Sequence, residues 1–319
     1  MTMSMNEGDV KYFSFDGNDL IVDKENDDVT YNDEKHVYVG KKGVGEGKKF
    51  ISVTTLIGEF ENKFDSDFWK KYKALEELMG NDFINVKSSL LNTKKWDDSY
   101  IPDSITKEVF EETCNKYVKD WGETNRIACE YGTEIHAEQE TGFYNHAEKM
   151  IKRFNLGGTI PVYKNHHNLD IDTGIIPEML ISYIDPEGML RIAGQSDLII
   201  KNGNHIKVWD WKTNKKLKQK SYFDPKKKKY QMMKYPLNNI MDCNFLHYTL
   251  QLSLYAWMLQ KQNPDLIIDE LRIVHFTHDG EVNEYVLEYL KSDIEKILKY
   301  YKKQLILRKY EEENKPIIF

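Results

Sequence analysis

This sequence of 319 residues has few cysteines and no long apolar run, which argues against cysteine-rich and membrane-spanning proteins. The three cysteines are far apart and form no Cys-x-x-Cys pair, which argues against a disulfide framework, a zinc ribbon and a four-cysteine iron–sulfur cluster. No apolar run approaches the roughly 18 residues that a membrane span needs. The N-terminus, Met1 to Val10, is polar and acidic and lacks the pattern of a secretory signal. We therefore expect a reduced, cytoplasmic protein with no membrane partner.

The composition that remains is typical of a globular protein, with 40% hydrophobic and 13% aromatic residues. A disordered chain, a collagen and a coiled coil are thereby excluded. The formal net charge of −7 argues against a polyanionic partner, but it averages over two opposite segments. The first 34 residues carry ten acids against two lysines, whereas Lys212 to Lys234 holds ten lysines against one acid, Asp224.

Aromatic residues interleave the lysine-rich stretch at Tyr222, Phe223, Tyr230 and Tyr235. Lysines bind phosphates and flat rings stack on bases, so this combination suits single-stranded nucleic acid. A solvated surface loop is the alternative, and a lysine run considered alone favours that alternative.

Hydrophobic periodicity predicts a helical front half followed by a mixed sheet with flanking helices, without an internal repeat or a Gly/Ser-rich linker. A hairpin is expected at residues 28–39, and Ser52 is a good N-cap for a helix. The expected strands are 178–184, 190–200, 205–211, 271–277 and 282–287. The expected helices are 65–78, most of 104–154 with a break or close approach at Gly132, an amphipathic helix at 248–261, and 292–310.

Two neighbouring strands carry the most informative polar residues. Asp197 lies within the apolar strand 190–200, where an unpaired carboxylate is costly, and Asp210 lies near the end of the next strand. Asp210 and Lys212 are two residues apart and therefore share a face. Two carboxylates and an ammonium at one spot can hold Mg²⁺ or Mn²⁺ and position an attacking water. A structural Asp–Lys salt bridge is the alternative, and the Asp-x-Lys triplet alone favours it.

Four other polar residues complete the pattern, although each is a weak signal when taken alone. His136 lies on an expected helix, Glu178 is expected to open a strand after Pro177, and Gln251 and Tyr255 share one helical face. A helical histidine is more often a core or surface residue than a metal ligand. The glutamine and tyrosine are equally compatible with boundary packing.

The ordered set of these motifs over roughly residues 120–300 resembles the RecB-like exonuclease branch of the PD-(D/E)XK nuclease superfamily. His36-Val37-Tyr38 and the segment starting at Ser52 resemble the leader of bacteriophage members and of relatives of the mitochondrial genome-maintenance exonuclease. This resemblance implies an α/β, restriction-endonuclease-like mixed central sheet flanked by helices, with a helical N-terminal half. The implied regions are an acidic segment with a hairpin (1–50), a mainly helical region (51–160) and a nuclease core (161–319) with a lysine-rich insertion (213–247).

The resemblance also implies roles for individual residues. The expected catalytic residues are Lys212, Asp197, Asp210, Gln251 and Tyr255. The expected ligands of one or two Mg²⁺ or Mn²⁺ ions are His136, Asp197, Asp210, Glu178 and the carbonyl of Trp211. The expected DNA contacts are Lys215, Lys216, Lys218, Lys220, Lys226, Lys227, Lys228, Lys229 and Tyr230.

The function implied is that of a metal-dependent DNA exonuclease, preferring single strands, in replication, recombination or repair, in the host cytoplasm if the source is viral. A structure-specific endonuclease and a non-catalytic nucleic-acid-binding protein on a nuclease fold are the alternatives. The chain departs from the superfamily pattern in lacking the proline before Asp197 and in the long segment between Lys212 and Gln251. It also lacks the four cysteines of the members that hold an iron–sulfur cluster, so no cluster is expected.

Overall fold

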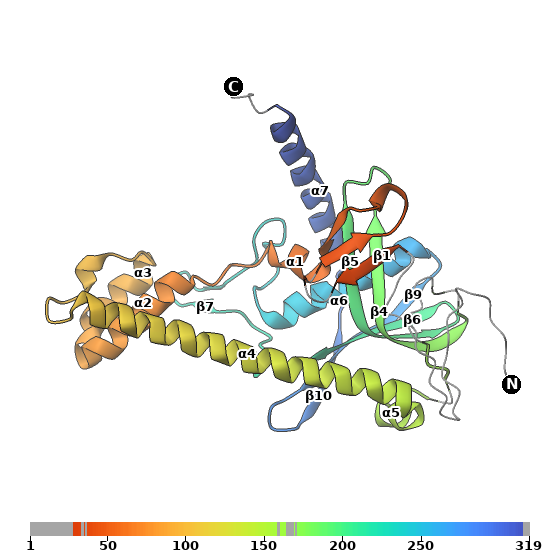
Figure 1. The fold of residues 1–319 in the computed structure, drawn as a ribbon, viewed down its shortest axis with the longest axis horizontal. Coiled ribbons are helices and arrows are strands. Elements are labelled where there is room, and N and C mark those ends of the chain that lie inside the picture. Colours follow the sequence, from red (N-terminus) through yellow and green to blue (C-terminus); the bar gives the residue numbers. More distant parts are fainter. Residues whose placement is uncertain are drawn as a thin grey trace. The chain divides into compact units, whose positions relative to one another are not determined.

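The computed structural model describes residues 28–32, 35, 37–157, 160–163, 169 and 171–314. Most of the acidic N-terminal segment, and His36 of the leader motif, lie outside these residues. The chain divides into two compact units, one made by the residues up to Asn62 and from Glu134 onward, the other by Lys63–Thr133. Helix α4 (Lys107–Asn145) contributes residues to both (Figure 1).

The first unit is built on an eight-stranded mixed sheet. Its described strands are β1 (Val29–Asn32), β2 (Val37–Gly40), β3 (Lys49–Ser52), β4 (Thr173–Ile184), β5 (Arg191–Asn202), β6 (His205–Lys212), β9 (Ile267–Phe276) and β10 (Val282–Leu287). The order is β1-β2-β3-β5-β6-β9-β10, with β4 paired to β5. The pairs β3–β5 and β6–β9 are parallel and the other pairs of this sheet are antiparallel. The mixed sheet flanked by helices confirms the predicted restriction-endonuclease-like α/β fold.

Strand β4 is longer than its sequence pattern indicated. It begins at Thr173, so Glu178 lies in the middle of the strand, and the prediction that Glu178 opens it was wrong. Pro177 has no N–H to donate and was expected to precede the strand, but it pairs with Leu198 of β5 within the ladder. A proline is tolerated there because β4 lies at an edge of the sheet, where one side of the strand needs no ladder bonds.

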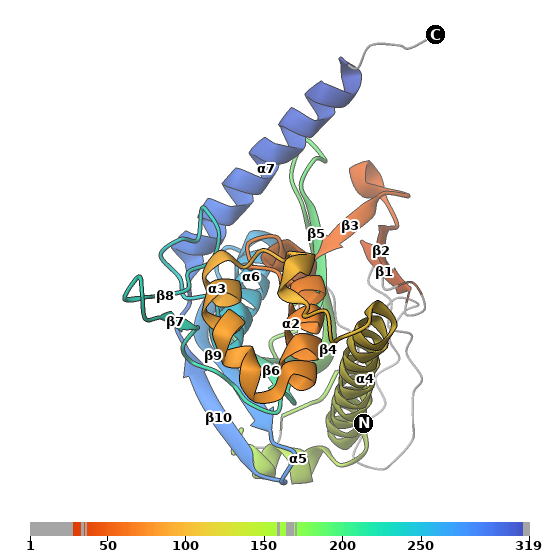
Figure 2. The ribbon, with the colours of Figure 1, turned by 90° about the vertical axis from the view of Figure 1, so that its left-hand side faces the viewer.

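The helices of the first unit flank its sheet, and one of them begins at a side-chain cap. Besides the end of α4 they are α1 (Val53–Gly58), α5 (Ala147–Arg153), α6 (Asn244–Gln262) and α7 (Lys291–Glu313), with a 3₁₀ turn η1 (Gly43–Gly45). Ser52 caps α1 as predicted, because its Oγ accepts a hydrogen bond of 3.0 Å from the Thr55 N–H. The C-terminal part of α7 extends away from the sheet and leaves Ile306, Leu307 and Tyr310 exposed (Figure 1 and Figure 2).

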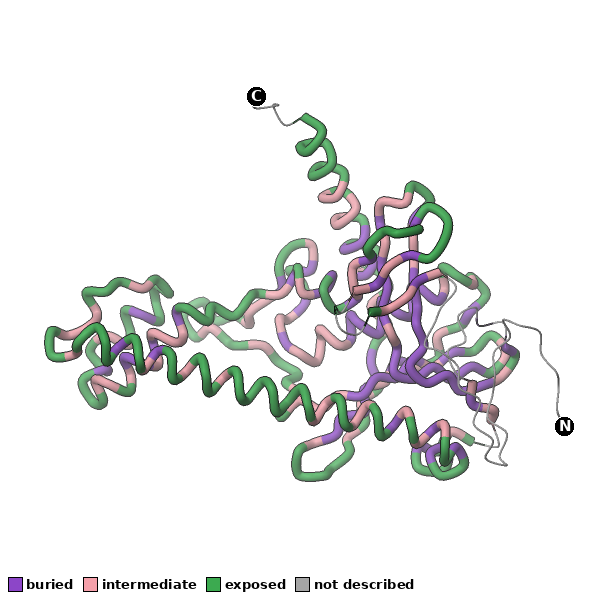
Figure 3. The backbone as a smooth tube through the Cα atoms, viewed as in Figure 1, coloured by how far each residue is buried: buried purple, intermediate pink, exposed green. Residues whose placement is uncertain are grey.

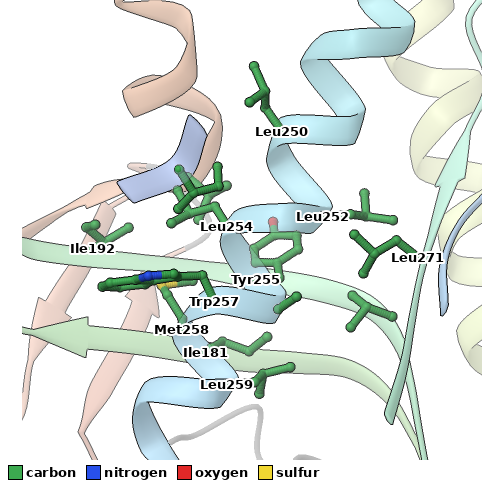
Figure 4. Packing of buried hydrophobic residues seen from close by; sticks show 14 of the residues in the cluster. Ile181, Ile192, Leu250, Leu252, Leu254, Tyr255, Trp257, Met258, Leu259 and Leu271 are labelled. Carbon is green, nitrogen blue, oxygen red and sulfur yellow. The ribbon is translucent and has the colours of Figure 1, made fainter. Parts of the chain in front are cut away.

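Helix α6 forms the centre of the larger core. Every residue from Thr249 to Leu259 is buried, and the side chains in Figure 4 leave the helix on several sides. The prediction of an amphipathic helix was therefore wrong. The sheet, α1 and α7 surround α6, and a helix that is surrounded in this way is apolar on all sides. The burial pattern in Figure 3 shows the same concentration of buried residues in the sheet and α6.

A smaller core covers the opposite face of the sheet. Phe143 of α4 and Phe154, just after α5, stack near Trp211 at centroid distances of 6.5 and 5.5 Å. Leu198 of β5 and Val274 of β9 belong to the same cluster. The aromatic packing attaches the end of α4 to the sheet, and that part of α4 carries His136.

The second unit is helical and has its own core. Its elements are α2 (Ser66–Met79), η2 (Gly80–Phe83), α3 (Ile84–Thr93), η3 (Asp98–Tyr100) and the first part of α4. Asp65 caps α2 by accepting from the Phe68 N–H at 3.0 Å, and Phe68, Leu75 and Phe110 are among its buried residues. Helix α4 continues through Gly132, which excludes a break there, one of the two alternatives expected for this glycine. Within the described residues, no helix combines the length and the hydropathy needed to cross a lipid bilayer.

Between β6 and α6 lies a separate hairpin of two short strands, β7 (Phe223–Asp224) and β8 (Lys229–Tyr230). Asp224 fixes its turn, since Oδ1 accepts from the backbone N–H groups of Lys226 and Lys227 at 2.9 and 3.1 Å. Lys226 to Lys229 therefore lie in and next to the turn of a hairpin, whereas Lys215, Lys216, Lys218 and Lys220 precede it in a segment without helix or strand.

Candidate functional site

The sheet register places Glu178 directly opposite Asp197. Pro177 pairs with Leu198, and the two acidic residues are the next positions on the antiparallel strands β4 and β5. Glu178 has a φ of +51°, a backbone conformation that residues other than glycine adopt rarely and at an energetic cost. Such a conformation persists only where the surrounding structure holds it, and functional sites are common among such places. Here the conformation interrupts the β4–β5 ladder at Glu178, opposite Asp197.

The same register argument brings Asp210 next to Asp197 from the other side. Leu198 pairs with Trp209, so Asp197 and Asp210 are the following positions on β5 and β6. The β5–β6 ladder ends at Leu198 and Trp209, and the Trp211 N–H donates a hydrogen bond of 2.6 Å to Asp197 Oδ2. Three acidic residues therefore follow one another across three adjacent strands.

His136 of α4 completes a cluster of possible metal ligands. Its Nδ1 lies 3.7 Å from Glu178 Oε1 and 3.5 Å from Asp197 Oδ1, and one ligand atom of each of the three residues falls within 4.8 Å of the others. Glu178 and Asp197 are buried, while His136 is partly exposed. Histidine nitrogen and carboxylate oxygens in one place are a suitable donor set for a divalent cation.

The electrostatics of this cluster also fit a cation. Burial, and next the charge of Asp210, raise the pKa of Asp197 well above its ordinary value. The charge of Asp197 in turn raises the pKa of His136 to about 9, against the opposing effect of burial. Among the described residues Glu178 Oε1 has no hydrogen-bond partner although it is buried. A buried carboxylate oxygen that accepts no hydrogen bond and lies beside another carboxylate is stabilised by positive charge.

Asp210 contacts Lys212 in an ion pair, and both side chains are almost completely shielded from solvent. Burial by itself lowers the pKa of Lys212, but the carboxylates of Asp210 and Asp197 outweigh it and leave that pKa raised. Gln251 Nε2 lies 3.3 Å from Asp210 Oδ1 and 3.3 Å from the hydroxyl of Tyr255, so it can donate to both. The structure thus brings together all the acidic, lysine, glutamine and tyrosine side chains expected at the catalytic site.

Gly194 is required at this site because Tyr255 packs directly on it. A Cβ at residue 194 would meet the ring of Tyr255 at 2.6 Å and a methyl group of Val53 at 3.1 Å. The glycine of the Gly194-Gln195-Ser196-Asp197 motif therefore permits α6 to approach β5 closely.

Trp211 contributes through its backbone N–H and through packing. Its ring is 1% exposed and lies within the aromatic core on the opposite face of the sheet. Its predicted contribution, a carbonyl ligand, stays a prediction.

The predicted nucleic-acid contacts lie in the segment after Lys212, on the exposed surface apart from the half-buried Tyr230. Tyr230 packs edge-to-face on Phe223 at 5.2 Å, and Tyr222 and Phe223 remain 64% and 45% exposed. Because this hairpin presents both lysines and rings to solvent, it has the chemistry that a nucleic-acid strand requires.

Two polar residues of the site were missed by the sequence analysis. Gln195 donates to Glu178 Oε2 at 2.7 Å, and the ring of Tyr248 lies 4.6 Å below the Lys212 ammonium. Simple periodicity signals both: Gln195 is two residues from Asp197 on a strand, and Tyr248 is three residues before Gln251 on a helix.

One of the comparisons with known proteins assigns this chain to a family. No curated protein sequence matches the chain. The crystal structure of SSO0001 is similar to it, with a TM-score of 0.32 and 15% sequence identity over 77% of this chain and 87% of that chain. A family model of the PD-(D/E)XK nuclease superfamily matches residues 73–315, well over half of the sequence. The chain, with its mixed sheet and its acidic site next to Asp210-Trp211-Lys212, therefore belongs to the PD-(D/E)XK nuclease superfamily.

Proposed function

We propose that this protein is a deoxyribonuclease that hydrolyses DNA phosphodiester bonds with one or two Mg²⁺ or Mn²⁺ ions. The observation that carries the proposal is the convergence of His136, Glu178 and Asp197 at one point, with the Asp210–Lys212 pair beside them. Folding gathers these groups from a helix and three strands, although a row of buried carboxylates is unfavourable without a compensating charge.

His136, Glu178 and Asp197 would hold the ion, with Asp210 and the carbonyl of Trp211 as further ligands. A divalent cation bound there would lower the pKa of a water molecule and neutralise negative charge on the phosphate. The imidazole favours Mn²⁺ more than an all-oxygen site would. This donor set is compatible with either ion.

The other side chains orient the reactants. Lys212, held protonated by its carboxylate neighbours, would direct its ammonium to a phosphate oxygen or to the attacking water. Gln251 and Tyr255 would keep Asp210 in place from α6, because the amide is shared between the two. Tyr255 stays uncharged because burial raises its pKa well above the ordinary value, and its hydroxyl accepts from Gln251.

Within the superfamily we place the chain in the RecB-like branch, of the type found in bacteriophages and in relatives of the mitochondrial genome-maintenance exonuclease. The support is the helical histidine next to Asp197 together with Gln251 and Tyr255 on α6. We propose an exonuclease that prefers single-stranded DNA and acts in replication, recombination or repair. It would work in the cytoplasm, that of the host if the chain is viral.

Digestion of matched linear and covalently closed circular DNA with Mg²⁺ or Mn²⁺ tests this proposal. We expect cleavage of linear DNA, faster for single strands, and none of circles. Cleavage of circles would identify an endonuclease on the same site. The absence of any cleavage would contradict the proposal and leave a non-catalytic nucleic-acid-binding protein.

Variants connect the activity to the site. Asp197→Asn and Lys212→Ala should lower kcat by about 10²- to 10⁴-fold, the range of positioned proton-transfer and charge-stabilising groups, and leave DNA binding intact. The matched control is Asp269→Asn, an exposed β9 carboxylate that pairs with His205 outside the site. If Lys212→Ala cleaved as fast as the control, the assignment of the site would be wrong.

A further inference from the structure

The ammonium of Lys212 is held between a carboxylate and an aromatic ring. Lys212 forms an ion pair with Asp210, and its Nζ lies 4.6 Å from the centroid of the Tyr248 ring. A cation over the face of a tyrosine ring is attracted by the quadrupole of the ring, most strongly where water is excluded. The lysine side chain is only 14% exposed, so this contact lies in such a place.

Tyr248 is itself fixed so that its ring, and not its hydroxyl, faces the lysine. The hydroxyl donates a hydrogen bond of 2.6 Å to Asn214 Oδ1. His275 Nε2 donates to the backbone carbonyl of Asn214 at 2.6 Å, and His275 is the residue that pairs with Lys212 in the β6–β9 ladder. The contacts thus form a closed circuit from Lys212 through Tyr248, Asn214 and His275 back to the strand of the lysine.

These contacts restrict the conformation of the Lys212 side chain. The side chain has a flexible four-carbon stem, so a single ion pair with Asp210 leaves it several rotamers. A second contact from a fixed ring restricts the ammonium to one position. Tyr248 also lies three residues before Gln251 on α6, so the same helix orients both Lys212 and Asp210.

We propose that Tyr248 is a positioning residue that fixes the ammonium of Lys212 beside Asp210 through the face of its ring, with Asn214 holding the ring in place. The inference rests on the proposed nuclease function and adds a residue to it. The proposal assigns different roles to the two parts of the tyrosine side chain: the ring contacts Lys212, and the hydroxyl bonds only Asn214.

Steady-state kinetics of two variants test this separation on the full chain. Tyr248→Leu removes the ring and should lower kcat by about 10- to 100-fold, the usual cost of losing a supporting residue, with KM for DNA unchanged. Tyr248→Phe keeps the ring and should restore most of the rate. Tyr289→Leu is the matched control, because Tyr289 is a half-buried tyrosine that bonds Gln260 elsewhere in this unit. A rate for Tyr248→Phe as low as that of Tyr248→Leu would overturn the role of the ring.

A double variant shows whether Tyr248 acts through the lysine. In a Lys212→Ala background, Tyr248→Leu should cost nothing further, because the group that it positions is gone. Multiplicative losses would show that Tyr248 acts independently of Lys212 and would overturn the proposal.

A spectroscopic measurement decides the placement without relying on catalysis. In protein labelled with ¹³C at the lysine ε position, the Lys212 signal, identified by its loss in Lys212→Arg, should be shifted upfield by the ring. The upfield shift should persist in Tyr248→Phe and disappear in Tyr248→Leu. An unchanged signal in Tyr248→Leu would overturn the inference. A wild-type chain that cuts no DNA would overturn the proposed function alone, and the lysine spectrum would still decide whether Tyr248 holds Lys212.

Discussion

Glu178 and Gln195 show how single residues prepare the site. Glu178 has a left-handed backbone in the middle of β4, and Gln195 of β5 donates a hydrogen bond of 2.7 Å to its Oε2. The other oxygen, Oε1, points to His136 and has no hydrogen-bond partner among the described residues. Gln195 therefore orients the carboxylate so that one oxygen remains available for an ion.

The first prediction concerns this hydrogen bond. Gln195→Ala should weaken Mn²⁺ binding by about 10- to 100-fold, because ligands that lose their supporting hydrogen bond must be ordered when the ion binds. Titration calorimetry of the full chain with Mn²⁺ measures the affinity. Gln262→Ala is the control, since this glutamine bonds the Ser182 carbonyl, also on β4 but away from the cluster. Equal affinities of the two variants would show that Gln195 does not orient a ligand.

At the scale of whole elements, Asp242 joins the lysine-rich insertion to the rest of the first unit. Its carboxylate accepts hydrogen bonds from the backbone and side chain of Asn62, from Gln231, and from His247 of α6. Burial alone would raise the pKa of Asp242, but the bonds from His247 and Asn62 outweigh burial and lower that pKa. The carboxylate thus connects the chain just after the hairpin to Asn62 and to the start of α6.

This pKa predicts how stability depends on pH. The pKa of Asp242 in the folded chain lies below the ordinary 3.8, so the unfolded chain binds the proton more readily. The stabilisation is therefore complete above this ordinary value and is lost as the pH falls through the lower folded pKa. Urea unfolding at a series of acidic pH values should show a smaller fall in the free energy of unfolding for Asp242→Asn than for wild type. A fall of equal size would contradict the prediction.

The β7–β8 hairpin is the element that we expect to contact DNA. Lys228→Glu/Lys229→Glu should weaken binding of single-stranded DNA and reduce the slope of log affinity against log salt by about 0.7 per lost phosphate contact. The control is Lys299→Glu/Lys303→Glu on α7, which makes the same change of charge on another exposed surface. Binding is measured by fluorescence anisotropy at several salt concentrations. Identical slopes for the two variants would show that Lys228 and Lys229 do not contact DNA and belong to a solvated surface loop.

At the scale of the molecule, the cores on the two faces of the sheet support different residues of the site. The core around α6 supports Gln251, Tyr255 and Tyr248, whereas the aromatic core on the opposite face holds the part of α4 that carries His136. A residue that holds His136 in place therefore need not lie near Glu178 and Asp197.

The last prediction compares the two cores. Phe143→Ala should lower the free energy of unfolding by about 3–5 kcal/mol and also weaken Mn²⁺ binding, because it loosens the attachment of α4. Ile297→Ala, at an equally buried position of α7, should destabilise the chain without changing Mn²⁺ affinity. Urea unfolding and metal titration measure the two quantities. Equal metal affinities for both variants would show that the aromatic core does not position His136.

The sequence predicted the elements well where local geometry decides. The strand 282–287 has the expected bounds, and the helices that begin at Asn244 and Lys291 lie within a few residues of expectation. The start of β4 was misjudged because a proline indicates a strand boundary unless the strand is known to lie at an edge. The burial of α6 on all sides was also missed, because several elements distant in the chain surround it.

The sequence by itself determined the pairs of residues that act as neighbours along one element. Asp210 and Lys212 share a strand face and Gln251 and Tyr255 a helix face, because periods of two and of about 3.6 residues are local properties of the backbone. Only the tertiary structure decided that Glu178 lies opposite Asp197, that His136 joins them, and that the ring of Tyr248 faces Lys212. Strand register and helix docking depend on packing between segments far apart in the chain, and local spacing carries no information about them.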